Sequence, residues 1–452
     1  MSEEDQLEKS ESIQETARRI LKLGPICDGC LGRQFAMLST GLTDGERGRS
    51  IKIVLAMEAS ARDDKQALED LAPNSKPARL KLGLNEEDAR CSVCLGEMRQ
   101  ENQNLWADWA ARALQGFEYR TFLVGTKITG LLAENEELVL VEGGSKYAEP
   151  LKSEMNREVG KLIAARTGKE VDFKRPDIVV HLNLEARDVE LQVASVYVYG
   201  RYRKVVRGIP QTRWPCRVCH GQGCPRCEGT GRMYPESVDE LIKPAVVDAF
   251  KAEDTVFHGA GREDIDARML GTGRPFVVEA VRPKVRTADL AALKDDINRR
   301  AQKKVEVSDL RYVEPQEVER LKDAAFRKTY EALVDLGTEA SEEKLKSVLK
   351  ELVGSVDQRT PTRVSHRRSD KHRARNVYRA ELQELSGKLA RIVINGDSGL
   401  YIKELISGDE GRTRPSLAEV LGSPAKVLEL DVVDVGGELN GTSSWNEEED
   451  EI

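Results

Sequence analysis

The segment most suited to chemistry is residues 259–276, with the sequence GAGREDIDARMLGTGRPF. It combines three acidic and three arginine side chains with glycines, so it is too polar for a core element. One interpretation is a glycine loop that cradles phosphate. However, Gly271 and Gly273 precede Arg-Pro and no helix, so the dinucleotide fingerprint is absent. The other interpretation is a surface loop with ion pairs, and composition leaves both open.

All eight cysteines occur as four Cys-x-x-Cys pairs, a spacing typical of metal ligands in an intracellular chain. Two pairs lie within residues 216–227, where Gly221 and Gly223 permit a tight turn. A redox dithiol and unmetallated turns are the alternatives. Four thiolates leave no open position for water, so we expect structural zinc. The expected ligands are Cys27, Cys30, Cys91 and Cys94 at one site and Cys216, Cys219, Cys224 and Cys227 at the other.

Two basic segments stand out in a chain whose net charge is −8. Residues 363–379 hold seven lysines and arginines against the single acid Asp370, and residues 201–207 interleave basic side chains with Tyr202. A solvated face and a phosphate-binding surface are both consistent with such clusters. Because the chain is acidic overall, any nucleic-acid binding must depend on these local patches.

The pattern of apolar residues predicts the elements that position these side chains. Strands are expected at 122–128, 137–142, 178–184, 190–200, 375–385, 388–395 and 427–435. Helices are expected at 6–23, at 284–303 with Thr287 as the cap, and from Ser341 onward. Helices and strands interleave without a regular βαβ period, which predicts an α+β fold.

Long motifs in a fixed order resemble those of pseudouridine synthases. Residues 261–264, Gly-Arg-Glu-Asp, resemble the Gly-Arg-x-Asp signature of these enzymes. The string through Phe276 resembles the archaeal and eukaryotic branch that acts at T-arm positions 54 and 55 of tRNA, most closely the archaeal enzymes. The supporting segments are QTRWPC at 211–216, YPESV at 234–238, QRTPTRVSHRR at 358–368, SGLYIKEL at 398–405 and GDEGRTRPS at 408–416. The resemblance spans residues 20–435.

The resemblance implies that Asp264 is the catalytic nucleophile, and the Gly-Arg-x-Asp spacing favours it over Asp266. Pseudouridine formation breaks the C1′–N1 bond, turns the base and joins C5 to C1′. The carboxylate would attack C1′ or remove a ribose proton, and no organic cofactor is needed. Arg262 and Lys403 resemble family positions whose charge would keep the carboxylate ionised.

The target base must leave the stack, and Tyr330 resembles the tyrosine that stacks on the flipped uridine. Ile402 and Leu430 resemble the apolar walls of the pocket. A packed core tyrosine and a core strand leucine are the alternatives for Tyr330 and Leu430. We assign a further set of side chains to phosphate contacts. They are Arg363, His366, Arg367, Arg368, Arg201 and Arg203.

The resemblance also implies several domains, including one whose layout resembles the THUMP class of tRNA-binding domains. We expect a zinc-binding region at 1–104, a THUMP-like domain at 105–212, a four-cysteine zinc hairpin at 213–236, a catalytic domain with a mixed or antiparallel sheet and flanking helices at 237–440, and an acidic tail at 441–452.

Composition excludes a membrane protein, because no apolar run approaches the roughly 18–20 residues that span a bilayer. The acidic start is no secretory signal, so we expect a cytoplasmic protein, a monomer that binds the T-arm of tRNA. A non-catalytic zinc-ribbon or THUMP RNA-binding module is the main alternative. A THUMP-bearing methyltransferase would need a glycine-rich loop after its first strand, and a zinc-ribbon co-chaperone a His-Pro-Asp tripeptide; the sequence has neither.

Overall fold

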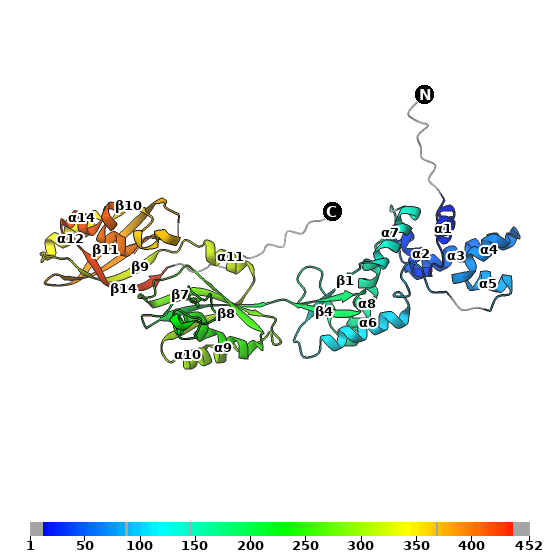
Figure 1. Cartoon of the computed structure of the whole chain (residues 1–452), viewed down its shortest axis with the longest axis horizontal. Coiled ribbons are helices and arrows are strands. Elements are labelled where there is room, and N and C mark those ends of the chain that lie inside the picture. The colour runs from blue at the N-terminus through cyan, green and yellow to red at the C-terminus, as the bar shows by residue number, and fades with distance from the viewer. Residues whose placement is uncertain (1–11, 86–88, 145, 368, 437–452) are drawn as a thin grey trace, which may run out of the picture. The chain divides into compact units, whose positions relative to one another are not determined.

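The computed structural model describes residues 12–85, 89–144, 146–367 and 369–436. The chain divides into two compact units between Ala194 and Ser195, whose elements are labelled in Figure 1. Two apolar clusters form the core of the first unit and a larger one forms the core of the second. Within the described ranges, no helix is long and apolar enough to cross a membrane.

The first unit begins with short helices whose starts are fixed by capping residues. Ser12 and Glu15 form a capping box at α1, and Thr43 and Glu46 form another at α3, so orphan amides of both helices are satisfied. The helices are α1 (Ile13–Leu21), α2 (Asp28–Gly32), α3 (Asp44–Ala61), α4 (Lys65–Leu71), α5 (Lys76–Leu82), α6 (Gln100–Ala113), α7 (Leu131–Gly143) and α8 (Leu151–Thr167), with the 3₁₀ turns η2 (Arg33–Phe35) and η3 (Ala72–Asn74).

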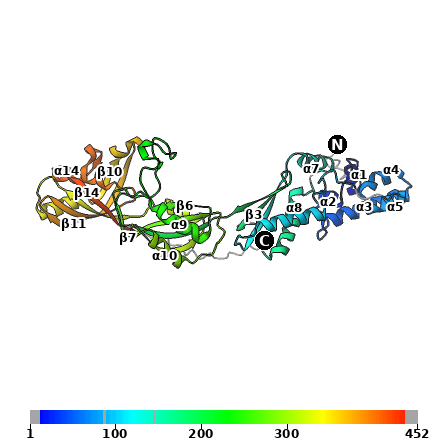
Figure 2. The same cartoon turned by 60° about the horizontal axis from the view of Figure 1, so that its bottom comes forward.

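A four-stranded sheet of order β2-β1-β3-β4 completes this unit. Helices α6 and α8 lie side by side and pack against β4 and β1 (Figure 1). Figure 2 labels α8 and β3 of this unit from a second direction. The strands are β1 (Thr121–Lys127), β2 (Glu170–Val171), β3 (Ile178–Asn183) and β4 (Asp188–Val193). The strand predicted at 137–142 is wrong, because these residues belong to α7. That helix buries only Leu132 and Val139, seven positions apart, and this helical period was hidden by the continuous apolar run Leu-Val-Leu-Val at 138–141.

The second unit is built on a sheet of order β13-β10-β11-β12-β9-β14-β7-β5-β8, with β6 paired to β7. Its strands are β5 (Val196–Lys204), β6 (Asp254–Gly259), β7 (Arg268–Val281), β8 (Val305–Val313), β9 (Lys328–Asp335), β10 (Gly354–Arg359), β11 (His372–Ser386), β12 (Leu389–Gly396), β13 (Thr413–Arg414) and β14 (Lys426–Val435). Most neighbours are antiparallel, and β14 runs parallel to β7. The predicted α+β class with a mixed sheet is confirmed.

Helices cover this sheet in two groups, α9 with α10 near β6 and β8, and α12 with α14 near β11 (Figure 1). The helices are α9 (Val238–Phe250), α10 (Leu290–Arg300), α11 (Gln316–Asp323), α12 (Glu342–Glu351), α13 (Ile402–Ser407) and α14 (Leu417–Leu421), with the 3₁₀ turns η4 (Pro225–Cys227), η5 (Thr362–Arg367) and η6 (Asp409–Gly411). Ser341 caps α12 as predicted. The cap predicted at Thr287 is wrong, because Asp289 accepts from two free amides at the start of α10.

The predicted strand 190–200 proves to be two strands in different sheets. β4 pairs with β3 in the first unit, whereas β5 pairs with β7 and β8 in the second. The predicted extent of the THUMP-like domain to residue 212 is therefore too long, since β5 belongs to the second unit. A continuous alternation of apolar residues does not reveal where a strand changes sheet.

Candidate active site and metal centres

Segments from distant parts of the second unit, five of which carry the predicted site residues, meet at a cavity of about 260 Å³. These five are the loop between β6 and β7, strands β9 and β14, the turn η5 and the start of α13. The sequence alone could not show that these distant segments converge. Seven predicted site residues line the cavity: Arg262, Asp264, Tyr330, Arg363, Ile402, Lys403 and Leu430.

Asp264 lies in the loop between β6 and β7, and its side chain is 33% exposed. Lys403 Nζ lies 3.4 Å from its Oδ2, and Arg363 donates to its Oδ1 at 3.3 Å. Two cations therefore lie against this carboxylate. Arg262 was expected to provide one of them, but its guanidinium lies 5.5 Å from the centre of the Trp214 ring. Arg363, predicted to bind phosphate, contacts the carboxylate instead.

Arg363 is fixed by a second acid that the sequence analysis missed. Glu404 accepts from Arg363 Nε at 2.7 Å, and its side chain is only 6% exposed. Burial disfavours the guanidinium charge, but the bonds to Glu404 and Asp264 hold the pKa of Arg363 above its usual value. Glu404 follows Lys403 in α13. One helical turn therefore supplies both Lys403, which contacts Asp264 directly, and Glu404, which supports Arg363, the other cation at Asp264.

A buried ionic network lies beneath the loop. Glu263, the variable residue of the Gly-Arg-x-Asp motif, accepts from Tyr202 Oη and from Arg274 Nε, both at 2.9 Å. Lys204 Nζ lies 3.6 Å from the same carboxyl group. Burial would raise the pKa of Glu263, but the charges of Arg274 and Lys204 outweigh it and hold that pKa below its usual value. Paired in this way, the charges can remain buried.

The same network holds the backbone of the loop. Lys204 Nζ donates to the carbonyls of Asp264 and Ile265, each at 3.3 Å, and Arg274 donates to Ala260 O at 2.7 Å. Gly261 has a φ of +74°, where a Cβ would also meet Arg274 and Lys328 side chains at 3.4 and 3.3 Å. The glycine of the motif therefore serves both backbone conformation and close packing.

Tyr330, Ile402 and Leu430 form the apolar walls of the cavity. They are 8%, 3% and 8% exposed, so each also belongs to the core, as the alternative interpretations of Tyr330 and Leu430 proposed. Burial and the negative charge of Asp264 raise the pKa of Tyr330 to about 12. The phenol therefore stays neutral at physiological pH, as suits a stacking surface.

Asp266, the competing carboxylate, occupies a different place. It lines a neighbouring hollow of about 350 Å³ and does not line the cavity of Tyr330. Its side chain is 69% exposed and pairs with Lys403 at 2.7 Å. Burial of the carboxyl group opposes ionisation, but the hydrogen bond from Lys403 outweighs it and lowers the pKa of Asp266. Geometry therefore favours Asp264 for chemistry in the cavity.

The basic segment 201–207 is not the open patch that the sequence suggested. Tyr202 and Lys204 point inward, as the period of two in β5 requires, and both are fully buried. Arg201 donates to the carbonyls of Thr272, Gly273 and Val435. Arg203 pairs with Glu306. Arg201 and Arg203 thus have internal partners. The side chains of His366, Arg367 and Arg368 lie outside the described residues.

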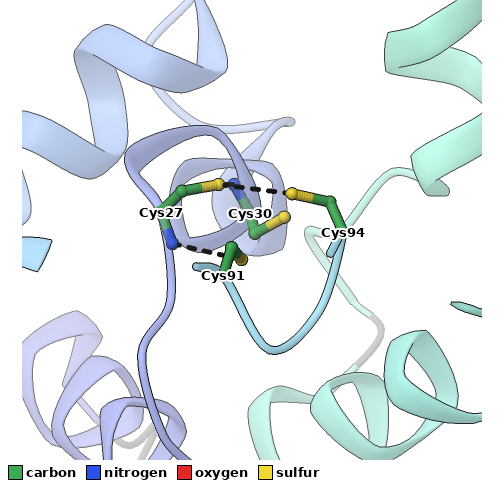
Figure 3. A group of neighbouring side chains, drawn as sticks. All are labelled: Cys27, Cys30, Cys91 and Cys94. Atoms are coloured by element: carbon green, nitrogen blue, oxygen red, sulfur yellow. Dashed lines mark hydrogen bonds between the residues drawn. The ribbon is translucent and has the colours of Figure 1, made fainter. Parts of the chain in front are cut away.

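The first cysteine cluster brings together two segments 61 residues apart at their nearest, as predicted. The sulfurs of Cys27, Cys30, Cys91 and Cys94 lie within 4.8 Å of one another. Figure 3 shows all four side chains converging, with Cys27 Sγ 3.8 Å from Cys94 Sγ. A tetrahedron with Zn–S bonds of about 2.3 Å has S···S edges of roughly 3.8 Å, so the donor set fits a zinc ion.

The second cluster is formed by the hairpin between β5 and α9. Its four sulfurs also lie within 4.8 Å of one another, and three S···S distances are 3.7–3.9 Å. Backbone amides of Gly223 and Gly231 donate to Cys219 and Cys227 sulfurs at 3.1 and 3.2 Å. Burial opposes the charge of Cys227, but backbone hydrogen bonds, one of them from Gly231, lower the pKa of its thiol and favour the thiolate, the form that binds metal. Each cluster could hold one metal ion.

Comparison with known proteins gives consistent matches over most of the chain. Family models described as "Pus10, C-terminal" and "Pus10 THUMP domain, archaeal" match residues 197–436 and 106–183. The tRNA pseudouridine synthase Pus10 of Methanothrix thermoacetophila is 61% identical over 94% of this chain and 95% of that protein. Its namesake from Halorubrum lacusprofundi is 44% identical over 94% of this chain and 97% of that protein. Among solved structures, a chain of a Cbf5-Nop10-Gar1 complex is 22% identical, covers 44% of this chain and 45% of its own, and has a TM-score of 0.29.

Proposed function

The chain belongs to the Pus10 family of tRNA pseudouridine synthases, and from this premise we propose that Asp264 is its catalytic carboxylate. We further propose that the protein isomerises uridine 54, uridine 55 or both in the T-arm of tRNA. The observation that carries the assignment is the position of Asp264 between Lys403 and Arg363 on a cavity that also contains Tyr330. An ionised oxygen beside an aromatic wall is what the reaction requires.

The walls suggest how the target nucleotide is held. The uracil ring, once out of the stack, would lie against Tyr330, with Ile402 and Leu430 excluding water around it. Its ribose would then face Asp264. Because Lys403 and Arg363 already lie against the carboxylate, it can act at the sugar without solvent reorganisation when the glycosidic bond breaks. The base turns within the cavity, and C5 then bonds to C1′.

Zinc is the metal that we propose for both cysteine clusters. The eight cysteines would hold two ions, each with four thiolates and no site for substrate, so the role is structural. Pseudouridine formation itself needs no redox step or group donor, and we propose that no organic cofactor takes part. Contacts of Arg201, Arg203 and residues 366–368 with phosphate remain predictions, as do a monomeric state and a cytoplasmic location.

The proposal is tested with purified protein and unmodified tRNA transcripts, without any added cofactor. Pseudouridine is mapped by chemical modification and primer extension at each uridine. We expect product at position 54, position 55 or both, and none in transcripts whose two T-arm uridines are replaced by cytidine. Product confined to another arm would disprove the site assignment, and its absence everywhere would disprove the activity.

A further inference from the structure

A lysine amine without an internal partner lines the same cavity. Lys328 is the first residue of β9 and lies on its inner face with Tyr330, two residues away. It is 7% exposed, and among the described residues its amine makes no hydrogen bond or ion pair. An unpaired buried amine is costly, so a fold that keeps one at its active site needs a compensating function.

The charges around this amine disfavour its protonation. Burial and the positive charge of Arg274 on β7 lower the pKa of Lys328 to about 8, against a smaller opposing effect of Glu263. Asp264, Arg363 and Lys403 line other walls of the cavity. Near neutral pH a fraction of the amine is therefore uncharged, with a lone pair directed at no protein donor.

The proposed reaction contains a step that needs such a group. When C5 has bonded to C1′, C5 still carries its hydrogen, and a base must remove that proton before the C5=C6 double bond can return. Other wall groups are unsuited to this step. Asp264 acts at the sugar, Tyr330 has a pKa of about 12, and Lys403 is paired with two carboxylates.

We propose that Lys328 is a further catalytic residue, the base that takes the C5 proton of the rearranged uracil. The C5–H bond breaks, its electron pair restores the C5=C6 bond, and Nζ becomes an ammonium. N1, released from the sugar, gains one proton, so the product is an isomer of uridine and no co-reactant is consumed. This inference rests on the proposed function, because it assigns one step of the same reaction.

The test compares two substrates, tRNA transcripts with uridine and with 5-fluorouridine. The fluorinated base has no C5 proton to lose, so its glycosidic bond can break and C5 can bond to C1′ without the base. We expect Lys328→Met and Lys328→Arg to slow turnover of uridine about 100-fold or more. Both variants should still form the fluorinated C-glycoside, detected by mass spectrometry of digested tRNA, at the rate of the unsubstituted enzyme. Lys346→Met, on the outer face of α12, is the matched control.

Failure of the proposed function and failure of this inference give different results. If the unsubstituted enzyme makes no pseudouridine, the proposed function is wrong. If it does, and the Lys328 variants slow both substrates equally or slow neither, the residue only positions the base or is unused. A pH profile of the unsubstituted enzyme gives a measurement that needs no variant. Its kcat for uridine should rise with pH through the pKa of Lys328, and a flat profile would overturn the inference.

Discussion

Asp264 contacts two cations that are supported in different ways. Lys403 is shared with exposed Asp266, so its position depends on a solvated neighbour. Arg363 is held from behind by buried Glu404, which limits the conformations of its guanidinium. A preorganised donor of this kind stabilises charge at little reorganisation cost. Glu404 is thus a positioning residue that acts on Asp264 through Arg363.

Glu404→Gln should lower kcat by roughly 10- to 100-fold and change KM little, because the loss concerns orientation of Arg363 and not substrate area. Steady-state kinetics on a tRNA transcript measure both constants. Glu351→Gln, at the exposed end of α12, serves as the control. An unchanged kcat in Glu404→Gln would show that Arg363 needs no such support.

At the scale of elements, the loop between β6 and β7 that carries Asp264 is held on two sides. The network of Glu263 and Arg274 holds it from beneath, as described above. On the other side Asp431 of β14 bonds Arg268 at 2.5 Å and Arg207 at 2.7 Å. Asp431 is next to Leu430 in β14. Its ion pair with Arg268 therefore joins the end of the loop to the strand that forms one wall of the cavity. The ion pairs of Asp431 therefore hold the loop and this wall of the cavity together.

Asp431→Asn should lower the free energy of unfolding of the second unit by about 1–3 kcal/mol at neutral pH. Burial opposes the charge, but Arg268 and Arg207 lower the pKa of Asp431 below 3.8. A depressed pKa stabilises the fold above the unfolded-state value, and this contribution is lost as pH falls through the folded-state pKa. Urea titrations should therefore show the difference between variant and parent shrinking below pH about 3.8. A difference independent of pH would contradict the ionic explanation.

The two cysteine clusters also join separate segments of the chain. Cys219→Ser should reduce bound zinc from two ions to one per chain, because it removes one of four thiolates of a single cluster. Elemental analysis of the purified protein measures the ratio. The control is His220→Asn, which neighbours the ligand, lies outside the cluster and keeps a side chain that tolerates its φ of +49°. Equal zinc loss in both variants would contradict the assignment of ligands.

At the scale of the molecule, the sequence supports more of the site than of the fold's connections. Apolar patterns located β1, β3, β11, β12 and β14, and the motifs named seven residues that line one cavity. Cysteine spacing alone predicted both clusters. The strand patterns and the cysteine spacing are local features. The seven site residues were named from motifs that occur along the chain in the order of the family.

Side-chain directions that tertiary contacts decide could not be predicted from the sequence. The inward direction of Lys204 and the side chain of Arg262 over Trp214 depend on neighbours far along the chain. Glu404 lies within the segment SGLYIKEL and Lys328 lies two residues before Tyr330, but neither was assigned a role from the sequence. Acidic or basic side chains next to motif residues are therefore the signal that could have found them.

The acidic chain must bind an acidic partner, which makes the basic segment 363–379 the expected contact. Lys371→Ala should weaken tRNA binding and reduce the slope of log Kd against log salt concentration by roughly 0.9, the effect of one phosphate contact. Fluorescence titrations at several salt concentrations measure this slope. Lys346→Ala should leave it unchanged, and equal slopes for all three proteins would place the tRNA elsewhere.

The central claim is that the Asp264 carboxylate performs the chemistry, and a single-turnover rate measures it most directly. Excess enzyme is mixed with radiolabelled tRNA transcript, and pseudouridine is quantified over time for Asp264→Asn and Asp266→Asn. We predict a loss of roughly 10⁴-fold or more for Asp264→Asn with tRNA binding retained, and a far smaller loss for Asp266→Asn. Pseudouridine formation by Asp264→Asn at a rate near that of the unsubstituted enzyme would contradict the account.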